Sequence, residues 1–425
     1  MRLLVEPGDY VLQNYGDVAM LQIAISRLAA LLPNASIQVF TSEPGLLVQF
    51  CPRAIPLLAP GPGSYEQPSL LAVPFIVRRL LFRSERLRRE LTPLVRYIRQ
   101  IKDRSARSRR TLPRVVLEAI SCADAMIFAG MGAINDAFPE YALGLLERIE
   151  QALKYRKPVV MVGQGIGPLE HPILRSKAMA VLPRLSFIAL REGKAGMPLL
   201  LSLGVNPDRV MVTGDDAIEI AISAGSACAA PGFGVNLRAA GYADVDSEFV
   251  FQCREILRRA ARRFGAPMVP VPISAFPGEE DAITIQRIIS ENSETSADGM
   301  NIDTPCKIID QIKSCRIVFT GAYHAAVFGL SLGVPVVCLA KSDYYRGKFL
   351  GVADLFGIGC EVIMAREPNW ESRLANALES AWRTADEVKP HLLAAAQRQL
   401  ILSRAAYKKL SEIVTGNASA SSQEI

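Results

Sequence analysis

The chain contains the stretch IVFTGAYHAAVFGLSLGVPVVCLA at residues 317–340, in which no Asp, Glu, Lys or Arg occurs. It is long enough to cross a membrane, but Gly321 and the turn Gly333-Val334-Pro335 divide it into shorter pieces. An apolar run comes first, followed by a glycine turn, a short helical piece, the Gly-Pro turn and a second apolar run. We therefore predict strand, loop, helix and strand, which is a βαβ unit of a parallel sheet buried on both faces.

The same alternation extends outward from this stretch. The N-terminal series begins with a strand at 2–5, a helix at 17–32 and a strand at 36–40, and continues with AMIFAG, PVVMVG, FIAL and VMVTG, separated by helices near 141–155, 172–182 and 193–203. The second series comprises GVNL, PMVPVPI, RIVFT, PVVCLA and CEVIMA, with helices around 248–264, 282–289 and 306–312. Two such series predict an α/β fold of two doubly wound, Rossmann-like domains that face each other across a cleft.

A segment rich in small residues, at 221–232, separates the two series and marks the domain junction. We place the N-terminal domain at 1–222 and the C-terminal domain at 223–415, the latter with a helical pattern from 370 to 414. The Ser- and Ala-rich residues 416–425 are expected to form a flexible tail.

The composition is that of a folded cytoplasmic protein. Of 425 residues, 50% are hydrophobic, which is enough to build substantial cores. The first five residues run into Glu6 and Pro7, so no apolar segment typical of an export signal is present there. The eight cysteines are scattered without a Cys-x-x-Cys pair, which predicts reduced thiols and no metal site.

Residues 45–112 break the alternation and are interpreted as an insertion in the first domain. Residues 78–114 carry 14 Lys and Arg against three acidic residues, with leucines at near-helical spacing. Two explanations stay open: an arginine-rich, solvated helix that packs on the first domain, or a helix in peripheral contact with anionic lipid at the inner face of the membrane. No nucleic-acid-binding motif accompanies the charges, so we expect no nucleic-acid partner.

Five glycine-containing turns follow predicted strands, at 14–17, 129–132, 163–168, 214–216 and 321–324. At the carboxyl ends of parallel strands such turns bring backbone N–H groups and helix N-termini toward anions. None matches the phosphate-binding Walker A pattern or the dinucleotide fingerprint. One turn alone can be explained by tight backbone geometry, but five together predict an anion-binding cleft.

Two side chains stand out at these strand ends. His324 begins a short helix directly after a buried strand, a position suited to acid/base catalysis, although a capping or packing role gives the same placement. Arg191 follows FIAL, where a guanidinium can bind carboxylate or phosphate in bidentate fashion, or form an ion pair at a domain surface. His171 and His391 are interpreted as structural.

A cationic loop is expected after PVVCLA. The segment 341–348 carries Lys341, Arg346 and Lys348. It is positioned to close over an anionic donor, although simple solvent exposure explains the same charges.

Six motifs occur in order: NYGDVAM, FAGMGAINDA, GQGIGP, ALRE, GDDA and TGAYHAAVFGLSLGVPVV. With them the chain resembles the polysaccharide pyruvyl transferase family from Tyr15 to about Gly351. The resemblance implies the glycosyltransferase B architecture, an active site between the domains, and transfer of pyruvate from phosphoenolpyruvate to sugar hydroxyls as a ketal. It further implies a role in surface polysaccharide or exopolysaccharide biosynthesis, a sugar or lipid-linked oligosaccharide acceptor, and no cofactor or metal.

The resemblance also implies roles for individual residues. His324 matches the motif histidine, a general acid/base, and Arg191 the arginine that holds the donor. The other expected donor-side residues are Gly321, Lys341, Arg346 and Lys348. The expected acceptor-side or pocket residues are Gly16, Asp17, Gly130, Gly132, Asp136, Gln164 and Gly165. Ala322 stands where the family commonly has an arginine, and we expect Lys341, Arg346 or Lys348 to supply the missing charge.

Two other functions remain open. TGAYHAAVFGLSLGVP also resembles the helix that faces the donor diphosphate in nucleotide-sugar-dependent glycosyltransferases of the B type. A non-catalytic family member that has lost its donor site is the second alternative.

Overall fold

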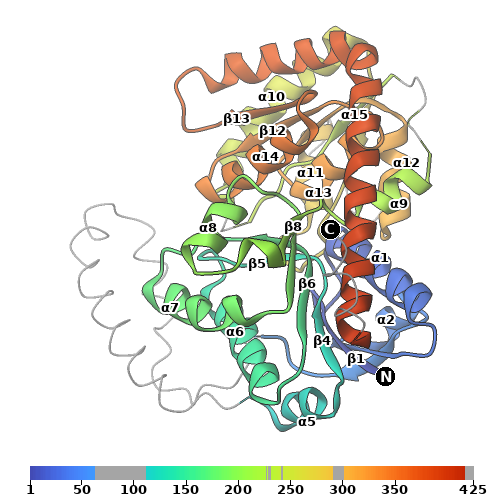
Figure 1. Ribbon diagram of the computed structural model, residues 1–425. Helices are drawn as coiled ribbons and strands as arrows, with labels where there is room; N and C mark the ends of the chain where they lie inside the picture. The colour runs from blue at the N-terminus through green and yellow to red at the C-terminus, as the bar shows by residue number, and fades with distance from the viewer. Residues whose placement is uncertain (63–111, 226, 228–230, 241–242, 291–300, 417–425) are drawn as a thin grey trace.

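The computed structural model describes residues 1–62, 112–225, 227, 231–240, 243–290 and 301–416. It contains two parallel β-sheets, one in each lobe of the molecule, with helices packed around them (Figure 1). The predicted α/β class with two Rossmann-like sheets is confirmed. The sheets divide between a strand that ends at Val212 and one that begins at Gly232.

The first sheet has eight strands in the order β3-β2-β1-β4-β6-β7-β8, with β5 paired to β6. Its strands are β1 (Arg2–Glu6), β2 (Ser36–Thr41), β3 (Ile55–Leu58), β4 (Ala125–Phe128), β5 (Met131–Ile134), β6 (Val159–Ile166), β7 (Phe187–Leu190) and β8 (Val210–Val212). All residues of β4 and β7 are buried, because helices cover both faces of a parallel sheet.

The second sheet has five strands in the order β10-β9-β11-β12-β13. Its strands are β9 (Gly232–Val235), β10 (Met268–Pro270), β11 (Cys315–Thr320), β12 (Val336–Ala340) and β13 (Cys360–Met364). The stretch 317–340 forms β11, a helix and β12, as its pattern predicts, and β11 pairs in parallel with β12.

Thirteen α-helices lie within the described part of the chain. They are α1 (Tyr15–Leu31), α2 (Pro44–Phe50), α5 (Arg114–Cys122), α6 (Pro139–Lys154), α7 (Pro172–Val181), α8 (Gly196–Ser202), α9 (Ile218–Ser223), α10 (Ser247–Phe264), α11 (Asp281–Ile289), α12 (Pro305–Lys313), α13 (Tyr323–Ser331), α14 (Asp343–Phe356) and α15 (Trp370–Thr415). None of them is long and apolar enough to span a membrane.

The strand order identifies where ligands bind. In the first sheet the chain runs outward from β1 toward β3 and outward from β4 toward β8, so the order reverses between β1 and β4. In the second sheet it reverses between β9 and β11. The loops that leave the carboxyl ends of strands at such a switch point diverge, and the space between them is the usual ligand site of an open parallel sheet.

The last helix belongs to both lobes. It is 46 residues long, runs past both sheets and is bent in Figure 1, as expected of a helix that contains Pro390. Leu392 and Ala396 pack in the core that includes α13, whereas Tyr407 and Leu410 pack in a core of the first sheet. This differs from the assignment of residues 370–415 to the second domain alone.

Two local expectations are wrong. The predicted insertion at 45–112 includes α2 and β3, and β3 extends the first sheet beside β2. The first part of this segment therefore belongs to the core of the first domain. The segment 341–348 is the start of α14 rather than a loop, because the Ser342 side chain caps the helix at the Tyr345 N–H. Residues 63–111, most of the basic segment, lie outside the described residues, as does the tail from 417.

Candidate active site

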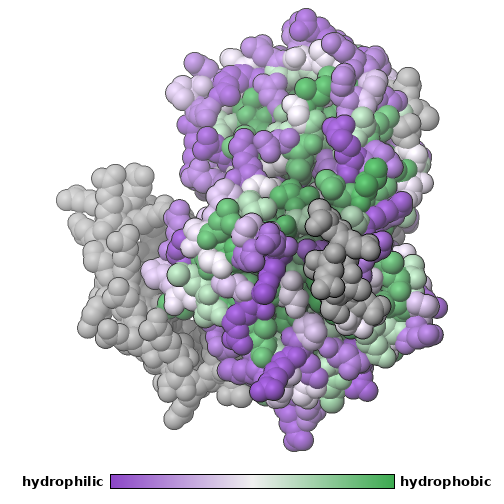
Figure 2. All heavy atoms as spheres, in the orientation of Figure 1, coloured by the Kyte–Doolittle hydropathy of each residue, from purple (hydrophilic) through white to green (hydrophobic). Residues whose placement is uncertain are grey.

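A cavity of about 370 Å³ lies where the carboxyl ends of the two sheets meet. Its walls come from the loops after β1 and β4 on one side, and from the loops after β9 and β11 together with α14 on the other. On the face shown in Figure 2, hydrophobic side chains gather where the two lobes join. The cavity thus occupies both switch points at once.

His324 enters this cavity from the second domain. It lies in the first turn of α13, is 5% exposed and lines the cavity. A Cβ at Gly16 of α1 would stand 2.0 Å from its Cγ and Nδ1 atoms, so only glycine there admits the imidazole. Its Nε2 atom lies 3.3 Å from Met20 Sδ and 3.6 Å from Asp215 Oδ2. The imidazole of one domain therefore packs on the other.

Asp215 joins His324 to Arg191. Its Oδ2 atom lies 3.6 Å from His324 Nε2 and 3.4 Å from Arg191 Nη1, and its carboxylate is buried. Burial raises the pKa of Asp215, but the hydrogen bond and charge of His324, together with Arg191, outweigh burial and leave this pKa below its ordinary value. The carboxylate is therefore available to stabilise a protonated imidazole.

Arg191 follows β7 and is 2% exposed. A Cβ at Gly132 would stand 2.4 Å from its Nη2 atom, and one at Gly165 would stand 2.8 Å from its Nε atom. The guanidinium carbon lies 4.1 Å from the centre of the Tyr323 ring, in a cation–π contact. Two glycines and one aromatic ring thus hold this cation at the cavity wall.

Lys348 reaches the same place from α14. Its Nζ atom lies 3.2 Å from the point where a Cβ of Gly132 would stand, the point that Arg191 also crowds. The ammonium lies 4.1 Å over the Tyr344 ring and donates a hydrogen bond to the Tyr344 hydroxyl. Burial lowers the pKa of Lys348 well below its usual range, and the charge of Arg191 lowers it further.

A third cation, Arg238, is missed by the sequence analysis. It follows β9, lines the cavity and is 4% exposed. Its Nε and Nη2 atoms bind the two carboxylate oxygens of Asp281 at 2.5 and 3.0 Å. Its signal in the sequence is an arginine directly after the apolar run GVNL. Gly321 lets the two loops approach, because a Cβ there would stand 3.3 Å from the Arg238 backbone nitrogen.

The first domain contributes carboxylates. Asp17 lines the cavity from the first turn of α1, which Asn14 caps. Asp9 lies in the loop after β1 and accepts backbone N–H groups of three residues between 11 and 14. Burial, with the charge of Asp17 as a smaller contribution, raises the pKa of Asp9 to about 6. The cavity therefore has a cationic side and an acidic side.

Other predicted residues shape the site from behind. A Cβ at Gly130 would stand 2.0 Å from Met20 Cε, so this glycine makes room for the methionine beneath His324. The buried Gln164 amide donates to the carbonyls of Phe128, Ala129 and Val162, which fixes the turn after β4.

Three predicted residues are not brought to the cavity. Asp136 accepts the N–H groups of Glu170 and His171 instead. Lys341 lies 3.6 Å from Asp246 and over the Phe249 ring. Arg346 is exposed on α14, because residues two apart on a helix point in nearly opposite directions and Lys348 takes the inward one. Within the described residues, no group of three or more His, Cys, Asp or Glu is placed to hold a metal ion.

Comparison with known proteins adds a family and a fold. The family model described as polysaccharide pyruvyl transferase matches residues 14–343, a range that contains His324, Arg191 and the five glycine turns. No curated protein matches the chain.

Several crystal structures share the fold. A candidate UDP-N-acetylglucosamine 2-epimerase from Listeria monocytogenes superposes with a TM-score of 0.57 at 12% identity, over 100% of this chain and 98% of that one. The UDP-GlcNAc 2-epimerase of Neisseria meningitidis gives 0.54 at 11% identity, over 98% and 100%. A glycosyltransferase from Rickettsia africae gives 0.52 at 10% identity, over 98% and 99%. The chain thus has the glycosyltransferase B architecture.

We predict that Gly16→Ala displaces the His324 imidazole, because the added methyl group would overlap the ring. Nitrogen-15 NMR of histidine-labelled protein can follow this, since the chain has only three histidines. The His324 ring signals should shift while those of His171 and His391 stay in place. Gly347→Ala is the matched control, because nothing lies within 4 Å of a Cβ there. Unshifted His324 signals in Gly16→Ala would contradict the packing described.

Proposed function

The chain belongs to the polysaccharide pyruvyl transferase family, and we propose that it is a transferase that moves pyruvate from phosphoenolpyruvate onto two hydroxyls of a sugar as a ketal. The observation that carries this proposal is the convergence of Arg191 and Lys348, from different domains, on the space beside Gly132 in the cavity that holds His324. The proposal includes a role in the biosynthesis of surface polysaccharide.

The cationic side of the cavity suits the donor. Phosphoenolpyruvate carries a phosphate and a carboxylate, and Arg191, Lys348 and Arg238 all line the cavity. Like charges that are close and partly desolvated repel, and a bound anion removes this cost. The Arg238 backbone lies beside Gly321, the neighbour of Ala322, and Arg238 lines the cavity, so it brings a guanidinium near the position where the family commonly has an arginine. Lys348 supplies positive charge from α14.

The chemistry requires one proton donor close to the anion site. His324 protonates the methylene carbon of the enol phosphate, and the adjacent carbon becomes electrophilic. The oxygen of one sugar hydroxyl bonds to that carbon and its proton passes to Asp17. Phosphate then leaves with cleavage of the carbon–oxygen bond, and the second hydroxyl closes the ketal as its proton goes to the phosphate. One donor and two hydroxyls yield one ketal and inorganic phosphate.

The acidic side of the cavity suits the acceptor. Asp17 and Asp9 offer oxygen acceptors for sugar hydroxyls, and the Phe138 and Tyr344 rings, 5.9 Å apart at 86°, offer an apolar surface to a pyranose face. A lipid-linked oligosaccharide acceptor would place the enzyme in the cytoplasm, at the inner face of the membrane.

The basic segment 78–114 is proposed to touch that membrane. We expect the protein to sediment with vesicles that contain anionic lipid and a variant with the arginines of 78–114 changed to Gln to stay in the supernatant. Equal sedimentation of the two would contradict the proposal.

Ligand-induced thermal stabilisation tests the donor. Phosphoenolpyruvate at 100 times its dissociation constant should stabilise the fold by about 2.7 kcal/mol, seen as a rise in Tm. Arg191→Ala should abolish the rise in Tm. Arg346 is an exposed cation on the same helix as Lys348, so Arg346→Ala should retain the rise. A rise with nucleotide sugars alone would instead favour a glycosyltransferase, as the helix N-terminus of α13 at the cavity allows.

The affinity for phosphoenolpyruvate should fall as pH rises. In the empty cavity the pKa of Lys348 is held well below its usual range, and the bound anion raises it. At a pH between the pKa of Lys348 in the empty cavity and its higher pKa in the complex, binding of the donor takes up a proton. In that range the affinity drops up to about tenfold per pH unit. Calorimetric titration above pH ~7.5, where the donor's phosphate is fully ionised, measures this slope. The arginine of Lys348→Arg stays charged, so the affinity of this variant should depend less steeply on pH. An equally steep dependence would contradict the assignment of the proton uptake to Lys348.

A further inference from the structure

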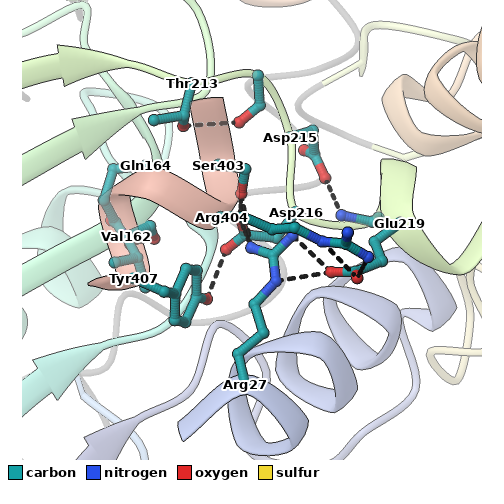
Figure 3. A network of polar contacts seen from close by, with 12 residues as sticks. Arg27, Val162, Gln164, Thr213, Asp215, Asp216, Glu219, Ser403, Arg404 and Tyr407 are labelled. Carbon is teal, nitrogen blue, oxygen red and sulfur yellow. Dashed lines mark hydrogen bonds and ion pairs between the residues drawn. The ribbon is translucent and has the colours of Figure 1, made fainter. Parts of the chain in front are cut away.

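The residue that follows Asp215 is the centre of a second, buried cluster. Asp216 is 1% exposed. Its Oδ2 atom accepts a hydrogen bond of 2.7 Å from the Tyr407 hydroxyl, and its Oδ1 atom accepts one of 2.5 Å from Ser403 Oγ. Arg27 Nη1 lies 3.2 Å from Oδ1. Figure 3 shows this cluster, with Ser403 and Tyr407 on α15 and Arg27 on α1.

The backbone at this turn is held as tightly as the side chain. Gly214 has a φ of +82°, a left-handed conformation that favours glycine. A Cβ there would stand 2.5 Å from Gln399 Oε1 and 2.7 Å from Gln399 Cβ, so the turn packs directly on α15. On the other side of the turn, the Ala217 N–H donates to Asp215 Oδ1 at 2.9 Å. The turn 214–217 is thus fixed between the last helix and the cavity.

The two consecutive carboxylates have different partners. Asp216 contacts α1 and α15, whereas Asp215 contacts Arg191 and His324. Neither aspartate lines the cavity. Asp215 therefore acts on the reaction through the two side chains that do.

We propose that Asp215 is a positioning residue that aligns His324 with Arg191, and that Ser403 and Tyr407 of α15 hold it in place through Asp216. The inference rests on the proposed pyruvyl transfer for its kinetic consequences, but not for its geometry. Because α15 packs on both sheets, the element that anchors the turn also joins the domains that carry His324 and Arg191. The last helix thereby sets the relative placement of the proton donor and the donor-binding cation.

Replacement of Asp215 separates positioning from general stability. Asp215→Asn keeps the size of the side chain and removes its charge. The protonated form of His324 loses its carboxylate partner, so kcat should fall about 100-fold. Arg191 loses a competing anion, so the KM for the donor should stay unchanged or fall. A kcat within twofold of wild type, or a kcat loss matched by a rise in KM, would overturn the proposal.

The anchor on α15 is tested by Tyr407→Phe and Ser403→Ala, each of which removes one hydroxyl from Asp216. A small displacement of the turn should lower kcat about tenfold with little change in donor binding. Ser411→Ala is the matched control, because the hydroxyl that it removes donates to the Lys408 carbonyl of its own helix and lies outside the cluster around Asp216. Equal kcat in all three variants would overturn the role of α15.

Histidine NMR on the ligand-free protein makes the outcome independent of the reaction. The His324 ring signals should shift in Asp215→Asn and Tyr407→Phe and stay in place in Ser411→Ala. If these shifts occur and wild type transfers no pyruvate, the proposed function fails and the positioning role stands. If wild type transfers pyruvate and His324 does not respond to Asp215→Asn, the positioning role fails and the function stands.

Discussion

The site depends on one buried carboxylate that is shared between two domains. Asp215 belongs to the first domain and lies within ion-pair distance of both Arg191 of that domain and His324 of the other. A buried carboxylate is costly unless it is paired, so Arg191, His324 and the Ala217 N–H are what keep Asp215 charged at this depth. The same contacts fix the distance between the two groups that the proposed chemistry needs most.

Glycines make the room that the charged side chains of the site occupy, within the first domain and between the two domains. Gly16 admits the imidazole of His324, and Gly132 and Gly165 admit the guanidinium of Arg191. These glycines contribute no binding group of their own. Their role is to let charged side chains from one element lie against the backbone of another, which explains why glycine turns and site residues occur together in the motifs.

The cavity separates charge by domain. The carboxylates at its wall on the first-domain side, Asp9 and Asp17, suit hydroxyl groups, and the cations Arg238 and Lys348 of the second domain suit an anion. There are two exceptions: Arg191 crosses from the first domain toward Lys348, and Glu279 of the second domain also lines the cavity. Positive charge reaches the cavity from the loop after β9 and from α14, although Ala322 itself carries none.

The sequence by itself determined the two βα series, the position of His324 and Arg191 at strand ends, and the glycine turns, because apolar runs and turn residues are local signals. It did not distinguish Lys348 from Lys341 and Arg346, since that choice depends on the phase of α14, nor exclude Asp136, which caps a neighbouring turn. Only the tertiary structure decided three features: the pairing of Asp215 with His324, the position of Arg238 at the cavity wall, and the packing of α15 on both lobes. Each joins segments distant in sequence, and the angle between two packed domains determines which of their strand ends meet.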